Sequence, residues 1–277
     1  MTERRSSPSP LPDLAFNAWL AGLGRGVWRW VCGWWQIVVF SAELLVLAFS
    51  PACWHQSGRR AVLLQMYLAS APGLPGFTVL MALFNVVVIR IVVVTALSYG
   101  LSQYSLDAVV RVLVLELVPL AAALFIAVEY TIPGGSWLYK LRRDGGFARL
   151  RAQGIEPLAQ EALPRVLAGM FAVLLLAAIS CTLSLVLAYI AVHGFVWSAV
   201  GRYSHAVGNI FNPVVTMIFG LKTFMFAATV ALLPVANALR NVPRRAASRT
   251  SVELQGLVQM FVLLLLIEIL SLIGNYY

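Results

Sequence analysis

The chain has 277 residues, of which 61% are hydrophobic and 11% are charged, and its formal net charge at pH 7 is +9. A soluble domain of this length could not bury so much apolar surface, so the composition excludes an ordinary globule and indicates a polytopic membrane protein. Runs near the ~20 apolar residues that a helix needs to cross the hydrocarbon layer recur along the chain. Their continuous aliphatic character favours helices over barrel strands, and the predicted fold class is all-α.

The amino-terminal part differs in composition from the rest of the chain. Residues 1–13 are polar and proline-rich and are predicted to form a disordered cytoplasmic tail. Residues 14–60 combine tryptophan, arginine and glycine, and the first two favour the headgroup zone. We expect interfacial amphipathic helices in this region. The alternative is that residues 34–49 form a span, for which their length is marginal.

Residues 61–277 are predicted to form a five-span domain. The predicted spans cover residues 74–99, 109–132, 163–192, 213–239 and 252–274. Pro133-Gly134-Gly135 is expected to end the second span, because proline removes a backbone donor and glycine adds freedom. Residues 137–154 then form a short cytoplasmic helix or a pair of turns. Most loop arginines and lysines fall on this side, so the amino terminus is predicted to be cytoplasmic and the carboxyl terminus external.

No motif predicts catalysis. The three cysteines and three histidines have no paired or ligand-like spacing, so we predict neither a metal site nor a disulfide framework. A phosphate-binding loop reads Gly-x-x-x-x-Gly-Lys-Ser/Thr. Gly220-Leu221-Lys222-Thr223 lacks the upstream glycine of this motif, and its glycine and lysine are not adjacent. The chain is therefore predicted not to be an enzyme.

Ionisable side chains inside the predicted spans carry most of the functional information, because burying a charge in a bilayer is costly. These residues are Arg90, Glu116, Glu129, Lys222 and Glu268. Some of them could line a polar pocket that holds the headgroup of an amphiphile, or they could form structural ion pairs between spans. Structural pairing is favoured for Arg90 and Glu268, and Glu129 could reach the cytoplasmic headgroups. Arg111 lies about one helical turn before Glu116 and could partly neutralise it.

Two short motifs, Glu116-Leu117-Val118-Pro119 and Pro164-Arg165-Val166-Leu167-Ala168, follow one another along the chain. With them, from residue 116 onward, the chain resembles the permease subunit of MCE-type (mammalian cell entry) lipid-transport ABC systems, the MlaE/YrbE-like proteins, whose corresponding motifs are Glu-Leu-Gly-Pro and Pro-Arg-x-x-Ala. Further matches lie at Gln153-Gly154-Ile155-Glu156-Pro157, Lys222-Thr223 and Arg245-Ala246-Ala247-Ser248-Arg249-Thr250.

The resemblance implies an inner-membrane permease subunit that moves phospholipid or a related lipid to or from a periplasmic MCE-domain protein. It also implies a second permease subunit, identical or not, and a separate cytoplasmic ATPase that binds ATP and Mg, whereas this chain binds no cofactor. Glu116 and Lys222 fall at family positions near the lipid cavity, and Arg111 is a possible third headgroup residue. The residues expected to contact the ATPase are Trp137, Lys140, Arg142, Arg143, Asp144 and Arg149.

Two other functions remain open from the sequence. The segment at residues 137–154 is basic where the family's is acidic, which favours a non-transporting scaffold that anchors an MCE partner. An ion-coupled carrier that uses Arg90, Glu116 and Glu268 as relay sites would instead show gradient-driven uptake without nucleotide.

Overall fold

The computed structural model describes residues 39–40, 42–44, 46, 56–100, 105–154, 156–239 and 249–276. Residues 1–43 and 44–277 form two separate compact units, and the second is described below. The predictions for the tail and for most of the interfacial segment lie outside the described residues, as do Arg245 to Ser248 of the last family motif.

The described residues of the second unit are mostly helical and include no strand, which confirms the all-α prediction. Three of its segments are π-helical (η3, η4 and η5) and one is a 3-10 turn (η6). In chain order the elements are α2 (Gln56–Ser70), α3 (Gly73–Ser98), α4 (Ser105–Val109), η3 (Val110–Leu117), α5 (Val118–Ile126), η4 (Ala127–Thr131), α6 (Ile132–Arg143), α7 (Gly146–Ala152), η5 (Leu158–Ala162), α8 (Leu163–His193), η6 (Trp197–Ala199), α9 (Val200–Ile210), α10 (Pro213–Leu239) and α11 (Arg249–Tyr276).

Five stretches of the described chain are long and apolar enough to cross a membrane, which confirms the predicted five spans. They are Gly58–Ser98, Leu106–Arg143, Leu158–His193, Pro213–Leu239 and Gly256–Gly274. The first comprises α2 and α3, which meet at a turn, and the second is one continuous helix from α4 to α6. Both are longer than the sequence predicted.

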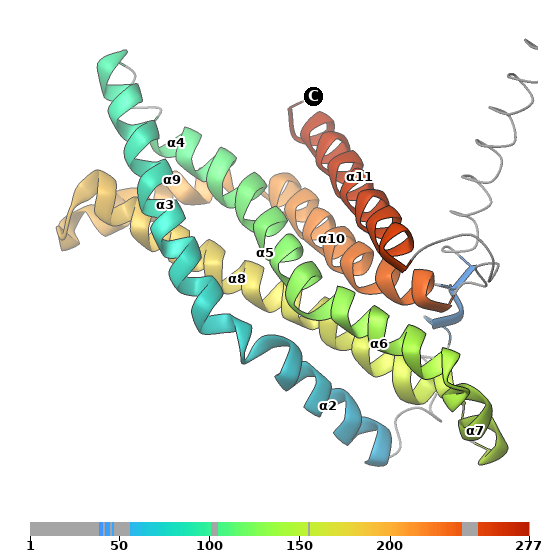
Figure 1. Ribbon diagram of the computed structural model, residues 1–277. Coiled ribbons are helices and arrows are strands. Elements are labelled where there is room, and N and C mark those ends of the chain that lie inside the picture. The colour runs from blue at the N-terminus through green and yellow to red at the C-terminus, as the bar shows by residue number, and fades with distance from the viewer. Residues whose placement is uncertain are drawn as a thin grey trace, which may run out of the picture. The chain divides into compact units, whose positions relative to one another are not determined.

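The helix α8 lies at the centre of the unit and packs against α2, α3, α5 and α10 (Figure 1). At one crossing a Cβ atom on Gly169 of α8 would lie 3.0 Å from Cγ2 of Thr131 and 3.3 Å from Cβ of Ala231. Small residues therefore let α8 approach both η4 and α10 closely, as is common where helices pack inside membranes. By contrast, α11 packs against α10 at the edge of the bundle and buries little of its surface (Figure 1).

Each π-helical segment ends two residues before a proline. The segments end at Leu117, Thr131 and Ala162, and the prolines are Pro119, Pro133 and Pro164. A proline inside an α-helix has no N–H and its ring meets the carbonyl of residue i−4, whereas a π turn widens the helix at that place. The prediction that Pro133-Gly134-Gly135 ends the second span is therefore wrong, because the helix widens in η4 and continues as α6 to Arg143.

The segment predicted as a separate cytoplasmic helix is divided between two elements. Residues 137–143 belong to α6, which is the end of the second span, and only α7 is a separate short helix. The chain turns between them at Gly145, whose φ of 75° favours glycine. The sequence placed the turn too early because it took the proline and glycines of residues 133–135 as a helix end.

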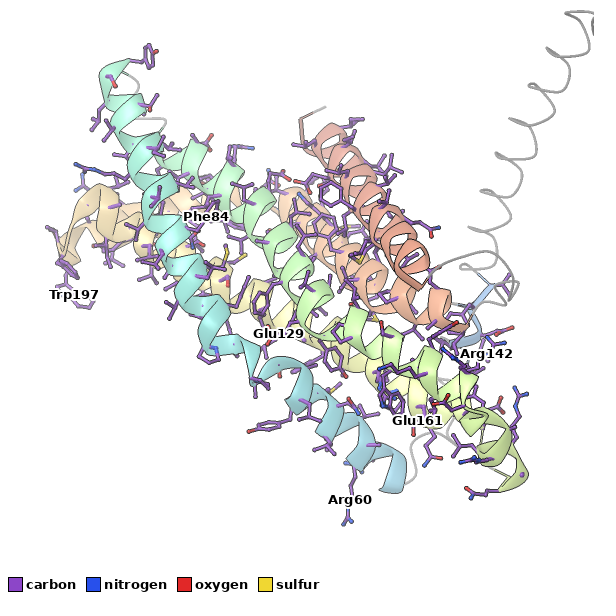
Figure 2. The ribbon with its side chains drawn as sticks, viewed as in Figure 1. Arg60, Phe84, Glu129, Arg142, Glu161 and Trp197 are labelled. Carbon is purple, nitrogen blue, oxygen red and sulfur yellow. The ribbon has the colours of Figure 1, made fainter. Side chains whose placement is uncertain are left out.

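The two ends of the bundle differ in chemistry. Figure 2 shows Arg60, Arg142 and Glu161 near one end, where α6, α7 and the start of α2 lie, and Trp197 at the other. At the second end α9 is held against α8 because the hydroxyl of Tyr203 donates to the carbonyl of Leu185 at 2.7 Å. Burial raises the pKa of Tyr203 to about 12, so this phenol remains a donor at any physiological pH.

Candidate functional site: a buried lysine between two carboxylates

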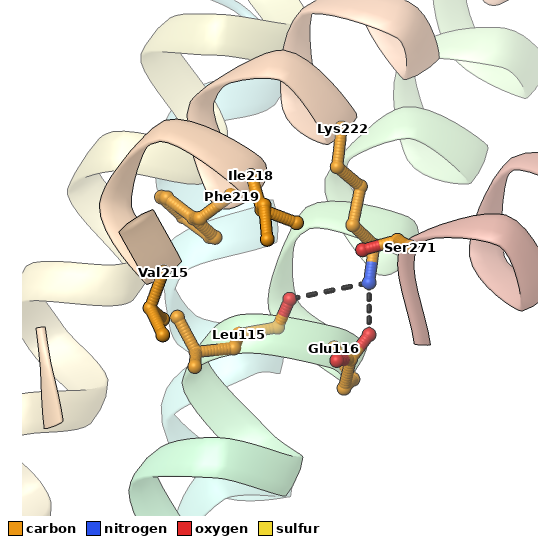
Figure 3. A pocket seen from close by; sticks show the side chains of 7 residues that line it. All are labelled: Leu115, Glu116, Val215, Ile218, Phe219, Lys222 and Ser271. Atoms are coloured by element: carbon orange, nitrogen blue, oxygen red, sulfur yellow. Dashed lines mark hydrogen bonds and ion pairs between the residues drawn. The ribbon is translucent and has the colours of Figure 1, made fainter. Parts of the chain in front are cut away.

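The most polar place inside the bundle is formed around Lys222, whose side chain is 1% exposed. Its Nζ forms an ion pair with Oε2 of Glu116 and lies 2.9 Å from Oε2 of Glu268. Nζ also donates to the carbonyl oxygen of Leu115 at 3.3 Å (Figure 3). The three charged side chains come from α10, η3 and α11, so this charge cluster (Glu116, Lys222 and Glu268) joins three spans that are far apart in the sequence.

The proline of the Glu-Leu-Val-Pro motif explains why a backbone carbonyl takes part. At the junction of η3 and α5 the backbone bonds change from i+5 to i+4 spacing, and Pro119 offers no N–H there, so the carbonyls of this turn, Leu115 among them, outnumber its amide donors. A carbonyl in a dry interior retains a strong need for a donor. The ammonium of Lys222 supplies one, so the motif places a carboxylate and a carbonyl acceptor on consecutive residues facing the same lysine.

The charge cluster contains one cation and two carboxylates. Removing charges from water is costly, and a buried pair persists only where the geometry and additional hydrogen bonds compensate. Lys222 meets that condition through its two ion pairs and the Leu115 carbonyl, and its Nζ also lies 5.7 Å from the centre of the Phe226 ring. The cluster therefore stabilises the charged form of Lys222, and the single positive charge of this lysine faces two carboxylates.

A small pocket adjoins the charge cluster. Its empty volume is at most about 180 Å³, a figure that includes space open to the outside. Its lining consists of Leu115, Glu116, Val215, Ile218, Phe219, Lys222 and Ser271 (Figure 3). Ligand sites for organic molecules usually enclose roughly 300–1,000 Å³. The pocket within one chain is thus too small for a two-chain lipid, although it combines an apolar wall with three polar side chains.

Arg111 does not belong to the charge cluster. Its Nε lies 3.0 Å from Oδ2 of Asp107, one turn earlier on the same helix. The expectation that Arg111 neutralises Glu116 is wrong, because Asp107 offers a closer partner at helical spacing and Lys222 takes that role instead.

Two other intramembrane charges lie away from the cluster. Glu129 is exposed, and its carboxylate lies against the first residue of α3, where a Cβ atom on Gly73 would be 2.7 Å from Oε2. A carboxylate at a helix amino terminus is favoured by the helix dipole. Arg90 is exposed on α3 and forms no hydrogen bond or ion pair with the residues that the structure describes.

The residues expected to contact an ATPase divide into two groups. Trp137, which is itself 42% exposed, and Arg142 contact other elements: the guanidinium of Arg165 lies 4.0 Å from the centre of the Trp137 ring, and Arg142 donates to the carbonyl of Leu239. The other four are exposed at the ends of α6 and α7, namely Lys140, Arg143, Asp144 and Arg149. We call these four residues the basic tip.

Sequence reasoning offered Glu116 and Lys222 as headgroup residues or as members of ion pairs and favoured pairing for Glu268, but it did not bring the three together. The sequence did contain a sign of this contact. Glu268 is the only acidic residue of the fifth span, Gly256–Gly274, and a carboxylate inside a span needs a cation such as Lys222. Ser271 was missed because a serine within an apolar helix bonds its own backbone readily and gives no clear sign of a site.

Comparison with known families agrees with the membrane architecture. The family described as "Permease MlaE" matches residues 62–273, which hold the whole charge cluster and include the five spans apart from the first four residues of the first and the last residue of the fifth. No curated protein matches the chain significantly. The chain accordingly belongs to the MlaE permease family and is a multi-pass membrane permease of the ABC-transporter type.

Proposed function

We propose that this chain is the permease subunit of a system that moves phospholipid or a related lipid between the inner membrane and a periplasmic MCE-domain carrier. The observation that carries the proposal is the buried charge cluster beside an apolar pocket, in a chain that belongs to a permease family. An amphiphile needs both surfaces, because its acyl chains require apolar walls and its headgroup requires charge or hydrogen bonds.

The size of the pocket favours a cavity shared between two permease subunits. About 180 Å³ within one chain does not accommodate a lipid, so the space must grow by opening or be completed by a second subunit. In the open state Lys222 would exchange one of its two carboxylates for the phosphate of the lipid. The second carboxylate would keep the lysine charged and oriented during that exchange.

Contacts of α6 provide a route for an ATP-driven movement. Arg142 bonds the carbonyl of Leu239 at the end of α10, and a Cβ atom on Gly135 would lie 2.9 Å from the carbonyl oxygen of Pro234 in the same helix. A displacement of the basic tip by a cytoplasmic ATPase, which would bind the ATP and Mg, would therefore move α10. Because α10 carries Lys222, the movement would reach the charge cluster.

The orientation that this function requires has the basic tip in the cytoplasm, with the amino terminus inside and the carboxyl terminus in the periplasm. The exposed arginines Arg59 and Arg60 lie at the start of the first span, and the basic tip follows the second. Loops rich in arginine and lysine are retained in the cytoplasm.

Lipid occupancy of purified protein tests the headgroup role. The protein is extracted in mild detergent, and bound lipids are quantified by mass spectrometry for the native chain, Lys222→Ala and Ser271→Leu. Both variants are expected to lose at least half of the bound phospholipid, since one removes the cation and the other fills the pocket while it leaves the charges intact.

The matched control is Lys140→Ala, which removes a lysine at the basic tip and is expected to keep full lipid occupancy while it weakens co-purification of an ATPase. Equal occupancy in all four proteins would contradict the headgroup role. Recovery of an MCE partner without any ATPase, even from the native chain, would favour the scaffold function instead.

A further inference from the structure

The first span carries an unpaired arginine on the face that points away from the bundle. The buried stripe of α3 contains Phe77, Met81, Asn85 and Ile89, which pack inward. Arg90 lies on the opposite face among apolar side chains, of which Leu83 is 64% exposed. At 100° per residue, Val79, Leu83, Val86 and Leu97 fall within about 40° of Arg90. We call this stripe the α3 outer face.

Arg90 lies deep in the span. The helix α3 runs over Gly73–Ser98, so its midpoint is near residue 85 and Arg90 is about 7 Å beyond it at 1.5 Å per residue. Cα–Cβ bonds in a helix tilt toward its amino terminus, which here is toward the midpoint. The Cα–Cβ bond of Arg90 therefore points away from the nearer end of α3, which disfavours reach to the headgroups on that side, and a charge at this depth is stabilised by an acidic partner.

A second copy of this chain does not offer that partner. Two subunits inserted the same way and related by a two-fold axis along the membrane normal keep each residue at the same depth. Glu129 contacts Gly73, seventeen residues from Arg90, and so lies roughly 25 Å from the required level. The remaining acidic residues within the described spans are in ion pairs: Glu116 and Glu268 with Lys222, Asp107 with Arg111, and Glu161 with Arg165.

We infer that the α3 outer face binds a membrane-spanning helix of a different protein, and that this helix carries an aspartate or glutamate opposite Arg90. A carboxylate at that depth supplies the missing charge, and apolar side chains above and below it pack against Leu83, Val86 and Leu97. Each charge is tolerated in the bilayer only when the other is present, so the pair selects this helix over other apolar helices. The inference depends on the charge of Arg90 and does not require that the transported molecule is a lipid.

Site-specific photo-crosslinking in native membranes tests the inference. A benzoylphenylalanine is placed at Leu83 or Val86 of the full chain, and at Val186 of α8 as the control, because Val186 is an exposed apolar position on a different span. Leu83 and Val86 are expected to crosslink to another polypeptide, within a single apolar span that contains an acidic residue, and Val186 is not. Identification of the crosslinked peptide by mass spectrometry provides the sequence of that span.

Charge exchange then tests the role of Arg90. The crosslink yield is expected to fall at least tenfold in Arg90→Glu and in Arg90→Leu, the second of which preserves an apolar span in case the first fails to insert. Replacing the acidic residue of the crosslinked span by arginine should restore the yield in Arg90→Glu. Arg202→Glu makes the same charge change outside the spans, on α9, and should leave the yield unchanged.

Three results would overturn the inference. They are crosslinks only to lipid or to another copy of this chain, a crosslinked span without an acidic residue, and a yield that Arg90→Leu does not change.

Discussion

Lys222 and Arg90 both lie within membrane-spanning helices of this permease, and the fold treats them in opposite ways. Lys222 faces the interior, where two carboxylates and a carbonyl surround its ammonium. Arg90 faces outward from α3, where no acidic side chain of the described chain meets it. The first charge is satisfied by the fold of one chain, whereas the second is left for another chain. A charged residue within a span can thus belong to an internal site or to a contact with another protein. The exposure of its side chain distinguishes the two cases, since Lys222 is buried and Arg90 is exposed.

Removing the interior cation should have the largest effect on stability. Lys222→Met leaves Glu116 and Glu268 facing each other without a cation, and breaking a buried ion pair in this way costs about 3–5 kcal/mol. Denaturant unfolding in detergent, followed by circular dichroism, would measure the loss. A change below about 1 kcal/mol would show that the charge cluster contributes little to the fold.

The helix contact that connects α6 to α10 should be the next most sensitive. Gly135→Ala places a Cβ atom 2.9 Å from the Pro234 carbonyl, and overpacking of this kind destabilises by about 1–3 kcal/mol. Gly134→Ala is the matched control one residue earlier, since its Cβ would meet only Cδ of Arg165 at 3.9 Å. The control should be neutral or slightly stabilising, because alanine favours a helix over glycine. Equal unfolding midpoints for the two variants would contradict the close contact.

Neutralising one acid of the charge cluster should have a smaller effect than removing its lysine. Glu268→Gln leaves Lys222 with Glu116 and the Leu115 carbonyl, so a one-to-one pair remains. We expect a change within about 1 kcal/mol of the native stability. The same unfolding assay, with Lys222→Met measured in parallel, checks the order. A loss as large as that of Lys222→Met would mean that both carboxylates are required.

The exterior charge should have the smallest effect on the isolated chain. Arg90→Leu removes a side chain without partners in the described chain, and substitutions of this kind usually change stability by less than about 0.5 kcal/mol. Its effect should appear only in the crosslinking described above. A loss of several kcal/mol in the purified chain would place Arg90 inside the fold and remove the contrast with Lys222.

The sequence predicted those features that depend on composition and local spacing. Long apolar runs identified the five spans, and the fourth was predicted at the bounds that α10 has. The end of the second span was wrong at Pro133 because local rules do not show whether a helix can widen ahead of a proline. The charge cluster brings together residues more than 100 positions apart in the chain, as with Glu116 and Lys222. The sequence offered them as candidates, but only packing could select Lys222 over Arg111 as the partner.

The carbonyl of Leu115 links two distant positions of the chain. Pro119 removes one amide donor from the turn that contains this oxygen, and Lys222 donates to it. A substitution at residue 119 that restores an N–H would add a backbone donor to this turn and make the lysine contact less necessary, and loss of the lysine would leave the turn short of a donor. Residues 119 and 222 should therefore change together during evolution, so that related chains without the proline also lack the lysine more often than chance predicts.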